Sequence, residues 1–496
     1  MTGGLIQLVA RGVEDLYLTN DPQITYFKVV YKRHTPFAME PIPQYFRNIA
    51  KFGEKCSCTI SKLADLIEQI YLHVELPSIP QFVNSTTGEI NTIYKFAWIK
   101  KIGYGIINKI EVEIGGQIID THYGDWLNIW EELTEDQTRL DNMLGNISDL
   151  YDFSNGKDAY TLTIPLQFWF CRNSGLALPI IALQYNDVKI HVEFNQAKDC
   201  YIIGPTASIV INDQFVHFDD YEFISQTIGT TTSVGQYIGF DEFTKTLYYN
   251  TIDGSFRSAP TTGSVYDYTI TGSTSRQICT PTPGVTEIKI NVKLASEPTI
   301  TKAFLYVNFV FLDIPERIKF TNSNHEYLIE QIQCDGDHIL INNNATINLG
   351  YSHPCKELIW RAQYDYIGSG NLKDKFNYTN NYDINNGINI IRKAKILLNG
   401  HERTAEKTGD FYNWVQSYYY HSYPPSEGIN VYSFSLNPEE HQPSGSCNFS
   451  KIDTIQLVLT LDTNLSYSHP GKIRVYCKSI NILRIISGLG GLAFEN

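Results

Sequence analysis

The sequence predicts an all-β protein made of antiparallel β-sandwiches, with only short helices in its loops. Three observations support this prediction. Hydrophobic and polar residues alternate with period two in many segments, as in strands that bury one face. Clusters of Gly, Pro and Asn separate these segments, which is typical of sandwiches and barrels rather than of βαβ units. A strand-turn-strand-helix unit also occurs twice, which indicates two related halves.

The alternating segments are the predicted strands. The clearest is NKIEVEI over residues 108–114, where Ile110, Val112 and Ile114 share one face and charged residues share the other. The same pattern occurs in four further segments, at residues 71–76, 188–194, 287–294 and 455–461. Each segment is expected to bury one face and expose the other.

The first predicted helix lies in GDWLNIWEEL, which begins at Gly124. Asp125 is its candidate N-cap, because a carboxylate can accept hydrogen bonds from the free N–H groups at a helix start. The hydrophobic residues that follow have the i, i+3, i+4, i+7 spacing of a buried helical face. They are Trp126, Ile129, Trp130 and Leu133.

The second predicted helix repeats this pattern 285 residues later, in GDFYNWVQSY. Asp410 is its candidate N-cap, and its expected buried face consists of Phe411, Trp414, Val415 and Tyr418. Two upstream pairs also match: the glycine turns VEIGGQ and ILLNGH at an offset of 284, and EQIYL and ELIWR at an offset of 289. Three matching pairs in the same order indicate a duplication with a boundary near residues 315–325.

Composition excludes several classes of protein. The 496 residues include 39 Lys and Arg against 53 Asp and Glu, and the net charge of -14 has the wrong sign for general binding to duplex DNA. The aromatic content of 13% is too high for a disordered chain. No apolar run approaches the ~18 residues of a membrane span, and the N-terminus lacks the features of a secretory signal. The nine dispersed cysteines are expected to be free thiols in a reducing compartment.

The sequence contains no recognisable catalytic, cofactor or metal motif. It lacks a phosphate-binding loop, a dinucleotide-binding glycine motif, an HExxH motif and a nucleophile elbow. The twelve histidines are dispersed, so neither a metal nor a cofactor is expected. Aromatic stretches at residues 168–170 and 417–425 leave a carbohydrate-binding surface open, although packing or subunit contact is the favoured interpretation.

Several long motifs resemble the major capsid proteins of nucleocytoplasmic large DNA viruses. The N-terminal block over residues 3–38 is similar to that family's opening signature, and FSLNPEEHQPSGSCNFSKID over 434–453 is the most specific match. Shorter similar segments lie at 185–194, 325–333, 353–360 and 481–494. The motif residues expected to have structural roles are Asp21, Pro22, Gln23, Phe27, Pro438, Glu439, His441, Pro443, Ser444 and Gly445.

The resemblance implies a double jelly roll, which is two eight-stranded antiparallel sandwiches in tandem. It implies an N-terminal arm at 1–24, a first jelly roll at 25–318 with a long loop insertion at about 199–285, and a second jelly roll at 319–496. By the same resemblance, the protein is a structural protein and not an enzyme, and it forms homotrimers that tile an icosahedral virion capsid over an internal membrane. Its implied partners are itself, neighbouring capsomers, minor capsid and penton proteins and, indirectly, the viral membrane, but no nucleic acid. Assembly is expected in the host cytoplasm.

Two alternative functions remain open at the level of sequence. One is a minor capsid protein, a spike or a carbohydrate-binding jelly-roll protein; the apparent duplication disfavours it, since penton proteins usually need one jelly roll per chain. The other is a β-sandwich glycoside hydrolase, since jelly rolls host such enzymes. No pair among the 53 acidic residues stands out as its catalytic carboxylates.

Overall fold

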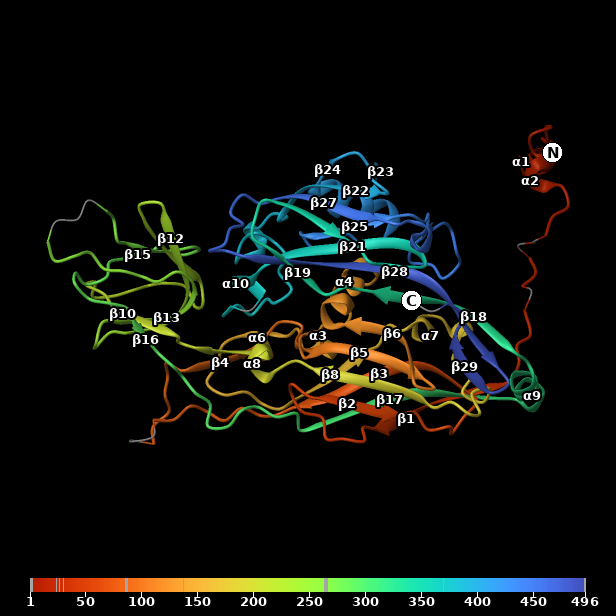
Figure 1. The fold of residues 1–496 in the computed structure, drawn as a ribbon, viewed down its shortest axis with the longest axis horizontal. Coiled ribbons are helices and arrows are strands. Elements are labelled where there is room, and N and C mark those ends of the chain that lie inside the picture. The colour runs from red at the N-terminus through yellow and green to blue at the C-terminus, as the bar shows by residue number, and fades with distance from the viewer. Residues whose placement is uncertain are drawn as a thin grey trace.

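Four antiparallel sheets form two sandwiches that lie one above the other in the computed structural model (Figure 1). The structure describes residues 3–494 except 24, 26, 30, 85–87, 137, 263–265 and 369. The sheets of the first sandwich have the strand orders β1-β17-β3-β7 and β2-β8-β5-β6. These strands are β1 (Phe37–Tyr45), β2 (Lys55–Thr59), β3 (Leu66–Leu76), β5 (Ile107–Ile114), β6 (Gln117–Tyr123), β7 (Tyr160–Pro165), β8 (Val188–Phe194) and β17 (Lys302–Leu312).

The second sandwich repeats this arrangement with the orders β18-β28-β21-β25 and β20-β27-β22-β23. Its strands are β18 (His325–Gln333), β20 (Asn344–Asn348), β21 (Pro354–Tyr364), β22 (Ile391–Leu398), β23 (His401–Glu402), β25 (Ile429–Ser433), β27 (Ile455–Leu461) and β28 (Gly471–Ile486). Four short strands extend these sheets: β19 (Asp337–Leu340), β24 (Lys407–Thr408), β26 (Cys447–Asn448) and β29 (Leu489–Leu492). Among the eight main strands of each sandwich, the first in the chain pairs with the last, and the last also pairs with the third. These neighbours are β1-β17-β3 in the first sandwich and β18-β28-β21 in the second. This shared order is that of a jelly roll, so the fold is an all-β double jelly roll.

The alternating segments confirm most of the predicted strands. In β5, the side chains of Ile110, Val112 and Ile114 are fully buried, and β3, β8 and β27 alternate in the same way. The prediction for 287–294 is wrong, because only β16 (Ile288–Lys289) is a strand there and its residues are exposed. Alternation needs a partner strand and a covering layer to become a half-buried strand, and this segment pairs only with Ala207 and Ser208.

A fifth sheet forms a separate lobe at one end of the molecule (Figure 1, left). Its strands are β10 (Ala207–Val210), β11 (Phe223–Ile228), β12 (Thr231–Asp241), β13 (Thr246–Asp253), β14 (Ile270–Gly272), β15 (Ile278–Cys279) and β16. The lobe has its own hydrophobic cluster, which includes Ile209, Ile224 and Leu247. A two-stranded pair, β4 (Lys95–Trp98) and β9 (Tyr201–Gly204), leads into it.

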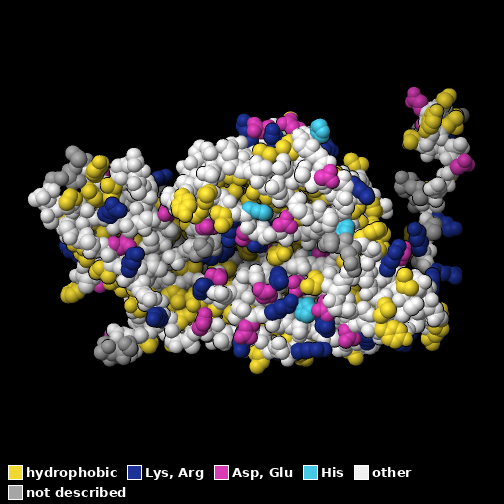
Figure 2. Space-filling model, viewed as in Figure 1, with side chains coloured by type: hydrophobic (Ala, Val, Ile, Leu, Met, Phe, Trp, Pro, Cys, Tyr) yellow, Lys and Arg dark blue, Asp and Glu magenta, His cyan; other side chains and the backbone are white. Residues whose placement is uncertain are grey.

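The N-terminal segment projects away from the sandwiches (Figure 1). It contains α1 (Gly3–Val9) and α2 (Leu16–Thr19), and neither helix buries a side chain. Figure 2 shows hydrophobic side chains on the surface of this segment, and they include Leu8 and Val9.

The other helices are short and lie in the loops. They are α3 (Ile102–Gly105), α4 (Gly124–Thr134), α5 (Asp141–Leu144), α6 (Ser148–Tyr151), α7 (Trp169–Arg172), α8 (Ala197–Cys200), α9 (Ile314–Asn322), α10 (Asp365–Gly368), α11 (Gln416–Tyr420), the π-helix η3 (Phe411–Val415) and the 3-10 turns η1 (Ser174–Leu176), η2 (Ile384–Asn386) and η4 (Phe449–Lys451). No helix in the described residues is long and apolar enough to cross a membrane. Most of the expected boundary near residues 315–325 lies in α9.

The two repeated units share one backbone feature. A Cβ atom added at Gly124 would lie 2.3 Å from the carbonyl oxygen of Tyr104, and one added at Gly409 would lie 2.0 Å from that of Ile391. Each helix therefore begins where a carbonyl group approaches the backbone too closely for any side chain.

The predicted face of the first helix is confirmed, whereas that of the second is wrong. Trp126, Ile129, Trp130 and Leu133 are all buried in α4. In the second unit the buried side chains are Tyr412, Asn413, Gln416 and Ser417, while Trp414 is 54% exposed and Phe411 is partly buried. The reason is the π-helical turn at Phe411–Val415, which has more residues per turn and rotates the expected hydrophobic face toward solvent.

Neither predicted N-cap forms. The N-cap position of α4 is Tyr123, and Asp125 lies inside the first turn. Asp410 precedes η3 with helical backbone angles, and its side chain makes no capping hydrogen bond. An N-cap needs an extended backbone to aim its oxygen at the N–H groups of the first turn, and Asp410 lacks this conformation.

Candidate functional site

The helix α4 lies at the junction between the two sandwiches (Figure 1). Instead of capping the helix, Asp125 binds two arginines of the second sandwich. Arg361 of β21 donates to its carboxylate at 2.7 Å, and Arg474 of β28 donates at 3.1 Å. Arg474 also donates to Asp337 at 2.8 Å. Burial opposes the charge of Asp125, but Arg474 and Arg361 outweigh it and hold the pKa of this carboxyl well below its usual range.

The two tryptophans of α4 also contact the second sandwich. The ring of Trp126 lies 5.2 Å from that of Tyr476 in β28. The ammonium group of Lys478 lies 4.0 Å from the centre of the Trp130 ring, and the Arg172 guanidinium lies 5.2 Å from it. A desolvated cation over a tryptophan face is attracted by the ring quadrupole, so α4 binds the second sandwich through both charge and aromatic packing.

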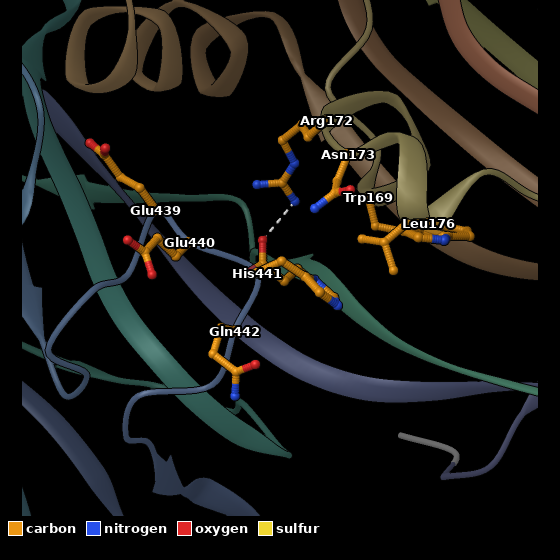
Figure 3. Close-up of a pocket in the computed structure, with 9 residues that line it drawn as sticks. Trp169, Arg172, Asn173, Leu176, Glu439, Glu440, His441 and Gln442 are labelled. Atoms are coloured by element: carbon orange, nitrogen blue, oxygen red, sulfur yellow. Dashed lines mark ion pairs between the residues drawn. The ribbon is translucent and has the colours of Figure 1, made fainter. Parts of the chain in front are cut away.

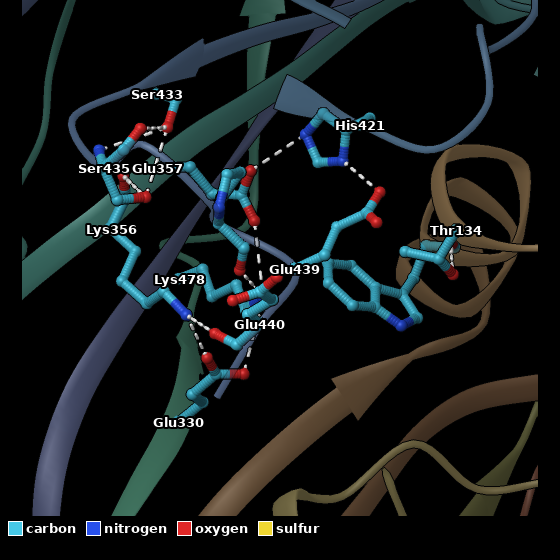
Figure 4. Close-up of polar contacts among 12 residues, drawn as sticks. Thr134, Glu330, Lys356, Glu357, His421, Ser433, Ser435, Glu439, Glu440 and Lys478 are labelled. Atoms are coloured by element: carbon cyan, nitrogen blue, oxygen red, sulfur yellow. Dashed lines mark hydrogen bonds and ion pairs between the residues drawn. The ribbon is translucent and has the colours of Figure 1, made fainter. Parts of the chain in front are cut away.

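A buried group of charged side chains lies beside Trp130 (Figure 4). Glu330 of β18 is at its centre and binds Lys356 at 2.5 Å, Arg172 at 2.8 Å and Lys478 at 3.4 Å. Glu357 binds Lys478 at 3.5 Å and His421 at 3.0 Å, and the other ring nitrogen of His421 lies 3.0 Å from Glu439. We call this set the ionic cluster: Arg172, Glu330, Lys356, Glu357, His421, Glu439 and Lys478. Arg172 comes from the first sandwich, so the cluster also joins the two halves.

The segment 434–453 closes over the ionic cluster. The carbonyl oxygen of Pro438 accepts a hydrogen bond from Lys478 at 2.6 Å, and that of Glu440 accepts one from Lys356 at 2.6 Å. The carboxylate of Glu439 accepts from the backbone and hydroxyl groups of Ser422 at 2.7 and 2.5 Å. The loop therefore supplies acceptors to lysines that would otherwise be buried with unpaired donors.

The remaining motif residues shape this loop. Ser444 accepts a hydrogen bond from the backbone N–H of Asn437 at 2.9 Å, which ties the two ends of the turn together. Gly445 has φ of 135°, and a Cβ there would lie 2.9 Å from the carbonyl oxygen of Phe434. Pro443 is exposed in the same loop, and His441 is partly buried, which lowers the pKa of its ring.

The charges of the ionic cluster stabilise one another. Burial raises the pKa of Glu330, but Lys478, Arg172 and Lys356 outweigh burial and lower it to about 2. Burial disfavours the charged form of His421, but Glu357 and Glu439 raise its pKa to about 9. For Lys478 burial has the larger effect, and its pKa is lowered to about 8. Near neutral pH these groups are therefore mostly charged and paired.

A pocket of about 500 Å³ opens beside the cluster (Figure 3). It is lined by Trp169, Arg172, Asn173, Leu176, Glu330, Glu439, Glu440, His441 and Gln442. Arg172 and Glu330, which form an ion pair with each other, both line the pocket, and the loop 434–453 forms one of its sides. In the part of the chain that the structure describes, no group of three or more His, Cys, Asp and Glu residues could hold a metal ion.

The structure brings some of the predicted site residues together and leaves others apart. Asp125, Trp126, Trp130, Pro438 and Glu439 all lie at the junction between the sandwiches. The N-terminal motif residues do not: Asp21, Pro22 and Gln23 are exposed, and Phe27 is 98% exposed. Residues 24, 26 and 30 of that block lie outside the described residues.

Sequence reasoning missed three buried cations, Lys356, Arg361 and Lys478, and the partly buried Arg474. Each stands in a strand of otherwise apolar character, as in KELIWR over 356–361 and RVYCK over 474–478. A charged residue in a strand that is buried on both faces is costly unless it is paired. A charged residue within an otherwise apolar strand was therefore the sequence signal for these cations, although it does not identify the acidic residues that pair with them.

Two jelly rolls joined through a helix and a buried ionic cluster define a structural protein of the double jelly-roll capsid class. Residues 25–240 match the family described as major capsid protein N-terminus, and residues 316–491 match the family described as large eukaryotic DNA virus major capsid protein. The chain belongs to the major capsid protein family of large eukaryotic DNA viruses. Its role is therefore structural and not enzymatic.

Individual relatives match over the full length. The chain is 44% identical to "Probable capsid protein 4" of Acanthamoeba polyphaga mimivirus, with all of both chains covered. It is 34% identical to the major capsid protein of Phaeocystis pouchetii virus, again over all of both chains. Among solved structures, a quasi-atomic model of the PBCV-1 virus capsid matches with a TM-score of 0.64 and 25% identity, covering 95% of this chain and 100% of that chain.

Proposed function

We propose that three copies of this protein form a pseudo-hexagonal homotrimer, and that these trimers tile an icosahedral shell over an internal membrane. One observation supports this above the others: a single chain contains two sandwiches with the same strand order. A ring of three such chains presents six related sandwiches, so threefold symmetry approximates sixfold packing. The similarity to chains in the PBCV-1 capsid supports self-association.

The junction between the sandwiches suits this role. A subunit that packs into a regular shell needs a fixed orientation between its two sandwiches. Directional contacts are required to hold that orientation. Asp125 with its two arginines and Glu330 with its three cations provide directional contacts that an apolar interface would lack. The ionic cluster therefore fixes the register between the halves.

Other parts of the chain have proposed places in the shell. Residues 1–24 form an arm on the inner side of the trimer, where the exposed apolar side chains of α1 meet minor capsid proteins and, through them, the membrane. Residues 25–318 and 319–496 are the two jelly rolls, and the lobe within about 199–285 forms part of the outer crown. Neighbouring trimers and penton proteins complete the shell. The net charge of -14 disfavours contact with nucleic acid, and assembly takes place in the host cytoplasm.

Light scattering of the purified full-length protein tests the proposal. A single species near three times the chain mass of 56.5 kDa is the expected result. A species that stays at 56.5 kDa at every concentration, including those used for capsid assembly, would contradict it.

A further inference from the structure

Three cysteines meet in the second sandwich. Cys355 of β21 and Cys477 of β28 are fully buried in its hydrophobic cluster, and Cys447 of β26 packs against the same cluster and is partly buried. All three are free thiols. We call them the thiol cluster, and the contacts described above between the two sandwiches do not use them.

The strand β21 brings two of these thiols within bonding reach. Cys355 lies directly opposite Cys447 in the antiparallel ladder between β21 and β26. Opposite residues of such a ladder share one face and have Cα atoms about 4.5–5.5 Å apart, within the range of about 4.4–6.8 Å that a disulfide spans. The side chain of Cys477, on the neighbouring strand β28, is hydrogen-bonded to that of Cys355. Cys355 can therefore bond to Cys447 without a movement of either strand.

The thiol cluster lies on the opposite face of the sheet from the ionic cluster. Cys355 directly precedes Lys356, and Cys477 directly precedes Lys478. Successive side chains of a strand point to opposite faces, so the thiols face the core while the lysines face the ionic cluster (Figure 4). The segment 434–453 reaches both: its carbonyl oxygens accept hydrogen bonds from the two lysines, and its one cysteine joins the thiol cluster.

The strand that attaches this segment to the sheet is very short. β26 pairs with β21 over two residues, Asn448 opposite Pro354 and Cys447 opposite Cys355. Pro354 has no backbone N–H, so one donor is missing from a ladder that is already brief. A covalent bond between the two cysteines would hold the segment 434–453 at a place where the backbone provides little attachment.

The three thiols differ in how an oxidant reaches them. Cys447 is the one that solvent reaches; burial raises its pKa, and the nearby Arg403 partly offsets this by favouring the thiolate. Burial and the hydrogen bond with Cys477 raise the pKa of Cys355 well above its usual value. An oxidant therefore attacks Cys447 first, and the raised pKa values keep the thiols reduced where reductants are abundant.

We infer that Cys355 and Cys447 are a modification site, at which a peroxide forms a disulfide that ties the segment 434–453 to β21. The Cys447 sulfur attacks one oxygen of hydrogen peroxide, the O–O bond breaks, and a sulfenic acid and one water form. The Cys355 sulfur then attacks the sulfenic sulfur, the S–O bond breaks, and the hydroxyl group leaves with the Cys355 proton as a second water. Two thiols are oxidised and one peroxide is reduced. This chemistry takes place within one chain and does not depend on the proposed trimer.

Peptide mapping of the folded full-length chain after treatment with hydrogen peroxide tests the inference. Free thiols are alkylated in denaturant, and the digest is analysed by mass spectrometry without reduction. We expect the peptides that contain Cys355 and Cys447 to be joined, with the loss of two hydrogen atoms, and to separate on reduction, while Cys477 carries the alkyl group. Any other bond from these cysteines, free thiols at both positions, or a Cys447 sulfonic acid beside a free Cys355 would overturn it.

A cysteine variant provides a second readout. Oxidation should raise the thermal midpoint of the original chain by roughly 5 °C, because the bond closes a long loop of the unfolded chain. Cys447→Ser should abolish both the joined peptides and this rise. Cys334→Ser is the matched control, since Cys334 is also partly buried but packs against the core of the first sandwich, and it should retain both. An equal rise in Cys447→Ser, or no rise in the original chain, would contradict the proposed attachment.

Discussion

The substitution Glu330→Gln should strongly destabilise the chain, because it leaves Arg172, Lys356 and Lys478 without their shared carboxylate. The pKa of Glu330 is lowered from 4.5 to about 2. A difference of this size corresponds to about 3 kcal/mol of folding free energy near pH 7. This agrees with the roughly 3–5 kcal/mol that is typical when one partner of a buried ion pair is removed.

The contribution of Glu330 to the free energy of unfolding depends on pH. Since folding lowers the pKa of Glu330, its contribution is fully present above pH 4.5 and is lost as the pH falls toward about 2. The difference in unfolding free energy between the original chain and the variant should therefore shrink to about 2 kcal/mol near pH 3.5. Urea unfolding followed by tryptophan fluorescence, at one fixed protein concentration, measures both quantities.

Glu326→Gln is the matched control for this experiment. Glu326 lies on the same strand, β18, and pairs with Arg484 at 2.8 Å, but its side chain is 58% exposed. Surface pairs of this kind contribute about 0–1 kcal/mol, so the control should be nearly neutral. If Glu330→Gln costs no more than Glu326→Gln, the ionic cluster does not stabilise the junction and the reasoning fails.

Three further predictions follow from the junction and the arm. Asp125→Asn should cost about 3–5 kcal/mol in urea unfolding, since it removes the buried carboxylate that Arg361 and Arg474 share and leaves them only Asp337, and a cost no larger than that of the surface control Asp187→Asn would contradict this. The pKa of His421 is raised to about 9, so its contribution is present below pH 6.5 and lost as the pH rises through 9; the stability difference between the original chain and His421→Gln should shrink over that range, and a constant difference would contradict it. Deletion of residues 1–20 should leave trimers intact by light scattering but impair shell assembly in electron micrographs, and normal particles from this truncation would refute the proposed arm.

The sequence predicted strands well where alternation coincided with a partner. Ile110, Val112 and Ile114 point into the first core as expected, because β8 and β6 flank β5 on both sides. The same alternation at 287–294 led to a wrong prediction, since a periodic pattern does not reveal whether a second strand lies alongside. Pairing is a tertiary property, and only the folded chain shows it.

The repeat was also a partial guide. Its spacing located both helices and the glycines that begin them, but it did not reveal the π-turn that exposes Trp414. The motif 434–453 was identified from its similarity alone, and its physical purpose, acceptors for Lys356 and Lys478, became visible only when strands far apart in the chain came together. The partners of a buried charge lie far away in the sequence, so a local sequence pattern cannot identify them.

A reconstruction of the purified oligomer by electron cryomicroscopy tests the central claim most directly. The account predicts a threefold ring with six sandwich-shaped densities, in which contacts within a chain alternate with similar contacts between chains. A ring in which the second sandwiches of different chains contact one another, or a particle with a single chain, would contradict it.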